Sequence, residues 1–102
     1  MYGTVARMKV AAGQEQAFEK LGEHWSTEFA AASGQVAEYV FRLDGRPGEY
    51  LLVAIFPDRA SYRANAENPA TDQFYRQMRA LLAADPEWND GEVVHAQVLQ
   101  GI

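Results

Sequence analysis

The stretch YLLVAIF, residues 50–56, contains seven consecutive apolar residues and no polar position. Gly45, Pro47 and Gly48 precede it and Pro57 follows it, and these residues favour turns on both sides of a strand. Successive side chains of a strand point to opposite faces, so both faces of this strand must be covered. In a chain of 102 residues, helices can cover only one of them. We therefore expect a homodimer in which the open sheet face of one copy packs against that of the other.

Hydrophobic periodicity predicts the other elements. Phe18, Leu21, Trp25 and Phe29 recur at intervals of three and four and form one apolar helical stripe. Asn68 is a suitable helix N-cap and breaks the second helical region in two. The predicted elements are a strand over 4–10, a helix over 14–33, strands over 36–43 and 50–56, a short helix over 58–66, a longer helix from 69 onward and a strand over 92–99.

This order, β-α-β-β-α-β, is the split βαβ arrangement of the ferredoxin-like α+β fold. It predicts a four-stranded antiparallel sheet with its helices on one face. Residues 1–102 contain no repeat, low-complexity run or linker, and we expect a single domain.

Composition excludes several classes of function. The formal net charge of -5 and the lack of a basic stripe argue against nucleic acid as a partner. The chain has no cysteine, and its two histidines lie on different predicted elements, so we expect no metal site. There is no nucleotide-binding glycine motif and no apolar run of membrane-spanning length. We expect a cytoplasmic protein that needs no cofactor.

Two stretches resemble a known family. Residues 56–62 read F-P-D-x-x-x-Y ahead of the broken helix, and residues 85–93 read D-P-E-W-x-D-G-E-V. With the element order and chain length, they make the chain similar to the antibiotic-biosynthesis-monooxygenase-like proteins, and the resemblance implies a dimeric α+β barrel. The superfamily includes cofactor-free monooxygenases of aromatic polyketides and quinols, haem-degrading enzymes and members without an assigned activity.

The resemblance disfavours haem degradation. That branch uses an asparagine on the first strand, a tryptophan on the split helix and a histidine on the long helix. The matching positions here hold Ala6 or Arg7, Asn65 and Met78. Met78 replaces the histidine, so the long helix offers no axial iron ligand.

The polyketide-oxidising branch implies the candidate catalytic residues. It uses an asparagine, a tryptophan and a tyrosine on the split helix, and an arginine. Asn65 and Tyr75 match two of these positions and Arg79 matches the arginine, while the tryptophan has no counterpart on the split helix. In this hypothesis Asn65 and Tyr75 orient and polarise the substrate, and Tyr62 or His24 moves the proton. Each also has a purely structural interpretation, as a cap, a packed ring or a solvent-exposed side chain.

Four further residues are expected to bind the substrate. Trp25, Phe41 and Phe56 would form the walls of an apolar pocket between sheet and helices, and Arg79 would hold an anion. Trp25 as a core residue and Arg79 as a surface residue are the alternatives. His95 belongs either to a polar patch at the dimer interface or to the pocket, and the sequence leaves this open.

The function predicted from these residues is cofactor-independent oxidation of a small aromatic phenol or quinol. The rival prediction is a dimer without catalytic activity, related to stress or binding an apolar small molecule. The missing tryptophan favours this rival.

Overall fold

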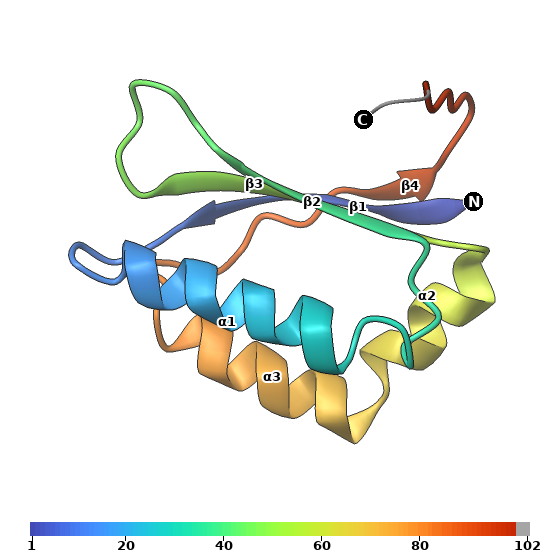
Figure 1. Ribbon diagram of the computed structural model, residues 1–102, viewed down its shortest axis with the longest axis horizontal. Coiled ribbons are helices and arrows are strands. Elements are labelled where there is room, and N and C mark those ends of the chain that lie inside the picture. The colour runs from blue at the N-terminus through green and yellow to red at the C-terminus, as the bar shows by residue number, and fades with distance from the viewer. Residues whose placement is uncertain (100–102) are drawn as a thin grey trace.

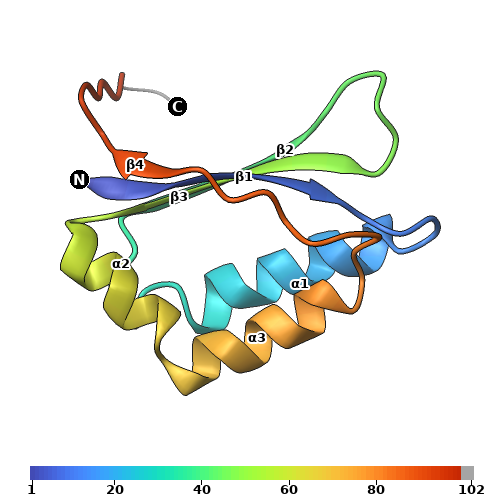
Figure 2. The same cartoon turned by 180° about the vertical axis from the view of Figure 1, so that it is seen from behind.

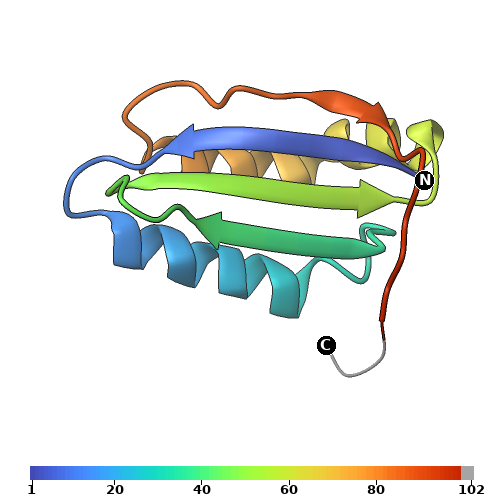
Figure 3. The same cartoon turned by 90° about the horizontal axis from the view of Figure 1, so that it is seen from above.

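The computed structural model describes residues 1–99 and contains one four-stranded antiparallel sheet with three helices against one face (Figure 1). Its strands lie in the order β2-β3-β1-β4, as Figure 3 shows from above. This confirms the predicted ferredoxin-like α+β fold. The elements are β1 (Tyr2–Lys9), α1 (Glu15–Glu28), β2 (Ala37–Arg42), β3 (Glu49–Phe56), α2 (Arg59–Ala66), α3 (Pro69–Arg79) and β4 (Asp90–Glu92).

The alternation of side chains divides β1 between the two faces of the sheet. Thr4, Ala6 and Met8 are buried under the helices, whereas Val5 and Arg7 are exposed on the open face. Ala6 and Met8 join Phe18 of α1 and Met78 of α3, among others, in one hydrophobic core. Burial of this apolar surface holds the helical layer against the sheet.

The central strand β3 is apolar on both faces, as its sequence predicts. Tyr50, Ala54 and Phe56 are buried on the helix side. The register between β2 and β3 aligns Tyr39 with Val53 and Phe41 with Leu51, and these four side chains share the open face. Tyr39 is 52% exposed and Phe41 is 53% exposed. Within residues 1–99, all three helices lie on the other side of the sheet (Figures 1 and 2).

Side-chain caps separate α2 from α3, as predicted. The Asp58 carboxylate accepts a hydrogen bond from the Ser61 backbone N–H at 2.7 Å and caps α2. The Asn68 side chain accepts one from the Ala70 N–H at 2.8 Å, with Pro69 in the first turn of α3. At this break the chain changes direction, so α2 and α3 run along different lines beneath the sheet (Figure 1).

The first helix is shorter than the predicted range 14–33. α1 ends at Glu28, and residues 29–34 form turns. The Ala30 N–H donates to the Trp25 carbonyl oxygen at 3.0 Å, five residues back, so the regular four-residue helical pattern ends before Gly34.

The prediction of a last strand over 92–99 is wrong in position. β4 covers only Asp90–Glu92, and the segment before it already pairs with β1. Arg7 and Glu87 exchange two backbone hydrogen bonds, of 3.0 and 2.9 Å, and the Val93 N–H donates to the Met1 carbonyl at 2.9 Å. Pairing along β1 therefore reaches Met1 at Val93.

Residues 93–99 leave the sheet on the side opposite the helices (Figures 1 and 2). This segment carries exposed apolar side chains, of which Val94 is 95% exposed. His95 lies in the same segment and is exposed. Within residues 1–99, no helix combines the length and the apolar character needed to cross a membrane.

The close approach of β1 and β3 at Gly3 leads to a first prediction. A Cβ atom at Gly3 would lie 2.1 Å from the Ala54 carbonyl oxygen, so Gly3→Ala forces the two strands apart. We expect it to lower the free energy of unfolding by about 1–3 kcal/mol, as overpacking does. Gly91 is the partner of Gly3 on β4, and a Cβ atom there meets nothing within 4 Å. Denaturant unfolding should therefore leave Gly91→Ala close to wild type, and equal stability of the two variants would contradict the prediction.

Candidate functional site

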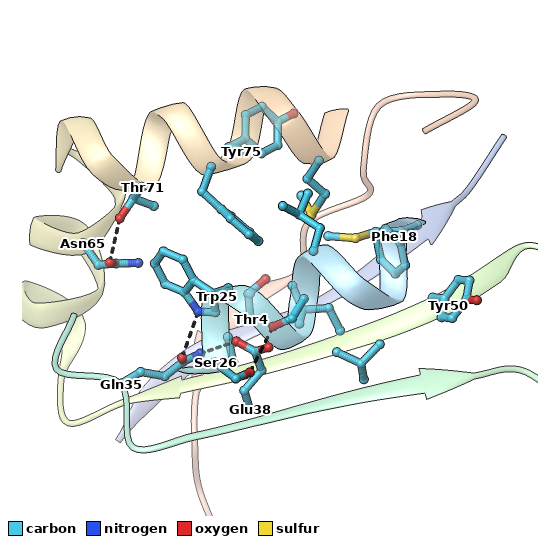
Figure 4. A pocket seen from close by; sticks show the side chains of 18 of the residues that line it. Thr4, Phe18, Trp25, Ser26, Gln35, Glu38, Tyr50, Asn65, Thr71 and Tyr75 are labelled. Atoms are coloured by element: carbon cyan, nitrogen blue, oxygen red, sulfur yellow. Dashed lines mark hydrogen bonds between the residues drawn. The ribbon is translucent and has the colours of Figure 1, made fainter. Parts of the chain in front are cut away.

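A cavity of about 950 Å³ lies between the sheet and the helices. Its lining is largely apolar and comes from all four strands and all three helices, with the side chains converging as Figure 4 shows. A volume of this size suits a small organic ligand. The apolar lining includes Phe18, Leu21, Trp25, Leu52, Phe56 and Phe74.

Asn65 lies on the cavity wall as expected. Its Oδ1 atom accepts a hydrogen bond from the Thr71 hydroxyl at 2.9 Å, across the break between α2 and α3. Figure 4 shows the amide nitrogen pointing inward from this bond, on the side of Trp25. The Thr71 contact therefore sets the amide orientation and leaves its N–H donors directed at the cavity.

Tyr62 also lines the cavity. Its hydroxyl donates to Asp90 Oδ1 at 2.9 Å, which connects α2 to β4. Burial, followed by the contact with Asp90, raises the pKa of Tyr62 to about 12. The phenol therefore stays protonated at neutral pH and is a hydrogen-bond donor rather than a base.

Trp25 and Phe56 form apolar walls of the cavity, as predicted. Trp25 is only 6% exposed, and its ring centroid lies 4.8 Å from that of Phe74. Phe56 packs edge-on against Tyr62 at 5.5 Å. These aromatic contacts hold the walls in place from both the helical and the sheet side.

Tyr75 belongs to the lining but lies at its edge. Its ring packs against Trp88 with centroids 6.2 Å apart. In Figure 4 the Tyr75 hydroxyl points away from Thr4 and Glu38 on the floor. The structure therefore places Asn65, Tyr62 and Tyr75 on the cavity wall. The Asn65 amide points inward, whereas Tyr75 contributes chiefly its ring.

Three of the predicted site residues lie outside the cavity. Phe41 points to the open face, so its expected place in the pocket wall is wrong, because the alternation of β2 turns Glu38 to the helix side instead. His24 packs edge-on against Phe29, beside a separate shallow depression. Arg79 donates from Nε to Asp85 Oδ1 at 2.7 Å and so joins α3 to the following loop.

Sequence reasoning missed a polar chain on the cavity wall. The Trp25 indole N–H donates to Gln35 Oε1 at 3.3 Å, and Gln35 Nε2 donates to Glu38 Oε2 at 3.0 Å (Figure 4). Burial raises the pKa of Glu38, although the bond from Gln35 and the nearby Trp25 indole oppose the shift. The available signal was the period-two pattern of β2, which places Glu38 opposite to Phe41, but the pattern does not say which face meets the helices.

Sequence reasoning also missed Thr4. This residue is only 3% exposed and lines the cavity from β1. Its Oγ1 atom is the one buried side-chain polar atom within residues 1–99 that has no hydrogen-bond partner. It lies near Tyr62 and favours the charged form of that phenol slightly, without reaching hydrogen-bond geometry.

A different polar group closes the opposite end of the cavity. Arg42 Nε donates to Glu19 Oε2 at 3.0 Å, and the Tyr50 hydroxyl donates to the same carboxylate. The bond from Arg42, and then that from Tyr50, lowers the pKa of Glu19. Glu19 is thus an ionised, fully engaged carboxylate. Within the described part of the chain, no three His, Asp or Glu side chains gather in a way that would hold a metal ion.

Solved structures share this architecture. A variant of SnoaB, a cofactor-independent oxygenase from Streptomyces nogalater, superposes with a TM-score of 0.80 at 20% identity, covering 93% of this chain and 94% of the other. A candidate antibiotic biosynthesis monooxygenase from Caulobacter crescentus gives a TM-score of 0.82 at 18% identity, with 92% and 90% covered. At these identities the likeness concerns the fold. No curated protein matches the chain by sequence.

The family model described as antibiotic biosynthesis monooxygenase matches residues 1–77, which contain β1 through most of α3 and therefore most of the cavity lining. The chain belongs to the antibiotic biosynthesis monooxygenase family.

Proposed function

We propose that the chain is a cofactor-independent monooxygenase that oxidises a small aromatic phenol or quinol in the cavity. In such a reaction the phenol loses its proton, and the electron-rich phenolate reduces dioxygen. One oxygen atom enters a ring carbon that gives up its hydrogen, and the other leaves as water, so a phenol and O₂ become a quinone and H₂O. All electrons come from the substrate. The protein must supply proton transfer, oxyanion stabilisation and an apolar site.

The observation that carries this proposal is the position of Asn65 on the wall of a large apolar cavity. The Thr71 hydroxyl binds the Asn65 carbonyl oxygen, so the amide N–H group is the part available to a ligand. A preoriented N–H donor stabilises negative charge on a substrate oxygen, because it needs no reorganisation as that charge develops.

Tyr62 and the aromatic walls complete this role. The raised pKa of Tyr62 keeps its hydroxyl protonated, and because Asp90 accepts that proton, Tyr62 lines the cavity beside Asn65 chiefly with its ring. Trp25 and Phe56 supply apolar surface against which an aromatic ring can pack. Tyr75 contributes the edge of the same surface.

The second candidate function is ligand binding without catalysis. It is favoured by the lack of a tryptophan on α2, which the resemblance associates with the polyketide-oxidising branch. The same cavity would then hold an apolar metabolite. Oxygen uptake separates the two functions.

We also propose that the chain forms a homodimer through the open sheet face. Tyr39, Phe41, Leu51 and Val53 provide an apolar surface there, and a second copy is the partner that offers a matching one. Residues 93–99 extend on the same side with Val94 exposed, and they would lie alongside the second copy. In such a dimer, each cavity would be covered by the helices of the same copy, because they lie on the other side of the sheet.

Replacing Asn65 tests the oxygenase proposal. We expect Asn65→Ala to lower the rate of oxygen consumption with hydroquinones or anthrones by about 10²–10³-fold, the usual effect of removing one oxyanion donor. An oxygen electrode measures the rate directly. Arg63→Ala, on the same helix but outside the cavity lining, is the matched control and should retain wild-type turnover. Unchanged turnover in Asn65→Ala would remove this residue from the mechanism.

A charge on the open face tests the dimer. Phe41→Glu places a carboxylate in the apolar surface, where pairing two copies would bury two like charges. Sedimentation at micromolar concentration should show dimers for the wild type and single chains for this variant. Gln73→Glu adds the same charge on exposed α3 and should remain dimeric. A monomeric wild type would refute the proposal.

A further inference from the structure

One row of residues crosses the floor of the cavity. Glu38 of β2 pairs with Ala54 of β3, Ala54 pairs with Thr4 of β1, and Thr4 pairs with Asp90 of β4. Paired residues of neighbouring strands project to the same face, so all four point toward the helices. Ala54 is the small member of the row, and it leaves space between Glu38 and Thr4.

Glu38 has a free carboxylate oxygen in this row. Its Oε2 atom accepts from Gln35, whereas Oε1 accepts no hydrogen bond within residues 1–99, and Glu38 forms no ion pair there. Gln35 is itself held by the Trp25 indole N–H. The carboxylate is therefore oriented by neutral donors, and burial disfavours its charged form and raises its pKa. A carboxylate with a free oxygen that faces the cavity is a candidate proton acceptor.

The other carboxylates of the lining are engaged or peripheral. Glu19 is bound by Arg42 and Tyr50, Asp90 accepts from Tyr62, and Asp72 pairs with Arg76 at 2.9 Å. Glu23 is exposed at the margin. The titratable groups that line the cavity with Glu38 are Glu19, Glu23, Arg42, Tyr50, Tyr62, Asp72, Tyr75 and Asp90.

Thr4 supplies an independent observation. Its hydroxyl is buried and has no partner among the described residues. A buried hydroxyl without a hydrogen bond costs free energy, so native proteins seldom keep one that has no use. Thr4 faces the cavity, and a ligand oxygen would satisfy it.

We infer that Glu38 accepts the proton of a phenolic ligand and that Thr4 Oγ1 binds a second oxygen atom of the same ring system, on the far side of Ala54. The proton moves from the phenol oxygen to Glu38 Oε1, and a phenolate remains. Two strand spacings separate the backbones of Glu38 and Thr4, about 10 Å, which leaves room for an aromatic ring system with an oxygen at each edge. The ligand class is an aromatic compound with oxygens on opposite edges. This inference rests on the proposed function.

The bound phenol can be titrated without any turnover. Under anaerobic conditions, 4-nitrophenol reports its ionisation by absorbance. We expect the bound probe to ionise in two steps in wild type, because the phenol and Glu38 share one proton before the second is lost, and in a single step in Glu38→Gln. Glu28→Gln, the same change on α1 outside the lining, should match wild type. Equal ionisation in wild type and Glu38→Gln would overturn the role of Glu38.

The stability of Glu38→Gln can be checked separately. Since burial raises the pKa of Glu38, its ionised form opposes folding as the pH rises above the unfolded-state value. Glu38→Gln should therefore unfold at the same or higher denaturant concentration than wild type at neutral pH. Marked destabilisation would show that the carboxylate is a structural group and would overturn the inference.

Thr4→Val tests the second contact with a nearly isosteric side chain. We expect affinity for 1,4-naphthohydroquinone under anaerobic conditions to fall about tenfold, and affinity for 1-naphthol, which lacks the second oxygen, to stay within twofold of wild type. Equal losses for the two ligands would overturn the contact with a second oxygen.

Turnover then separates this inference from the proposed function. If the chain is an oxygenase, Glu38→Gln should lower kcat about 10²–10⁴-fold for weakly acidic phenols, with little change in KM, and by less for phenols already ionised at the assay pH. A uniform effect on all phenols would contradict proton acceptance. Absence of oxygen uptake with every phenol would refute the proposed function, and the anaerobic titration would still decide the place of Glu38.

Discussion

The two apolar faces of β3 are the constraint on which the rest of the molecule depends. Its helix side, with Tyr50, Ala54 and Phe56, is buried and forms the floor of the cavity. Its other side stays partly exposed beside Tyr39 and Phe41. Because one strand serves both surfaces, the ligand site and the proposed dimer interface lie back to back, separated by the thickness of one sheet.

The cavity owes its polar groups to pairing rather than to any local motif. Glu38 and Thr4 lie 34 positions apart in sequence, and each is paired with the same residue, Ala54. Their orientation then depends on further tertiary contacts, such as the Trp25–Gln35–Glu38 chain and the Asn65–Thr71 bond across a helix break. Each polar group is therefore set by contacts between elements, in surroundings of low polarity that strengthen those contacts.

Sequence patterns were sufficient for the order of elements, the sheet type and the break before Asn68, because these depend on periodicity and on caps that act over a few residues. Asn65, Tyr62, Trp25 and Phe56, which were selected with the help of the family resemblance, line the cavity. Sequence patterns failed for the last strand, whose position follows from where the chain re-enters beside β1 after Leu82. Periodicity near the C-terminus carried no information about that entry point.

The sequence by itself determined that β3 has no polar face and that β2 carries two unlike faces, since alternation along a strand is a local property. Only the tertiary structure decided which face of β2 meets the helices. That choice places Phe41 outside the cavity and Glu38 inside it. The hydroxyl of Thr4 is buried on the same face, two strands away from Glu38. The physical reason is that a strand pattern is symmetric with respect to its two sides until packing against another layer distinguishes them.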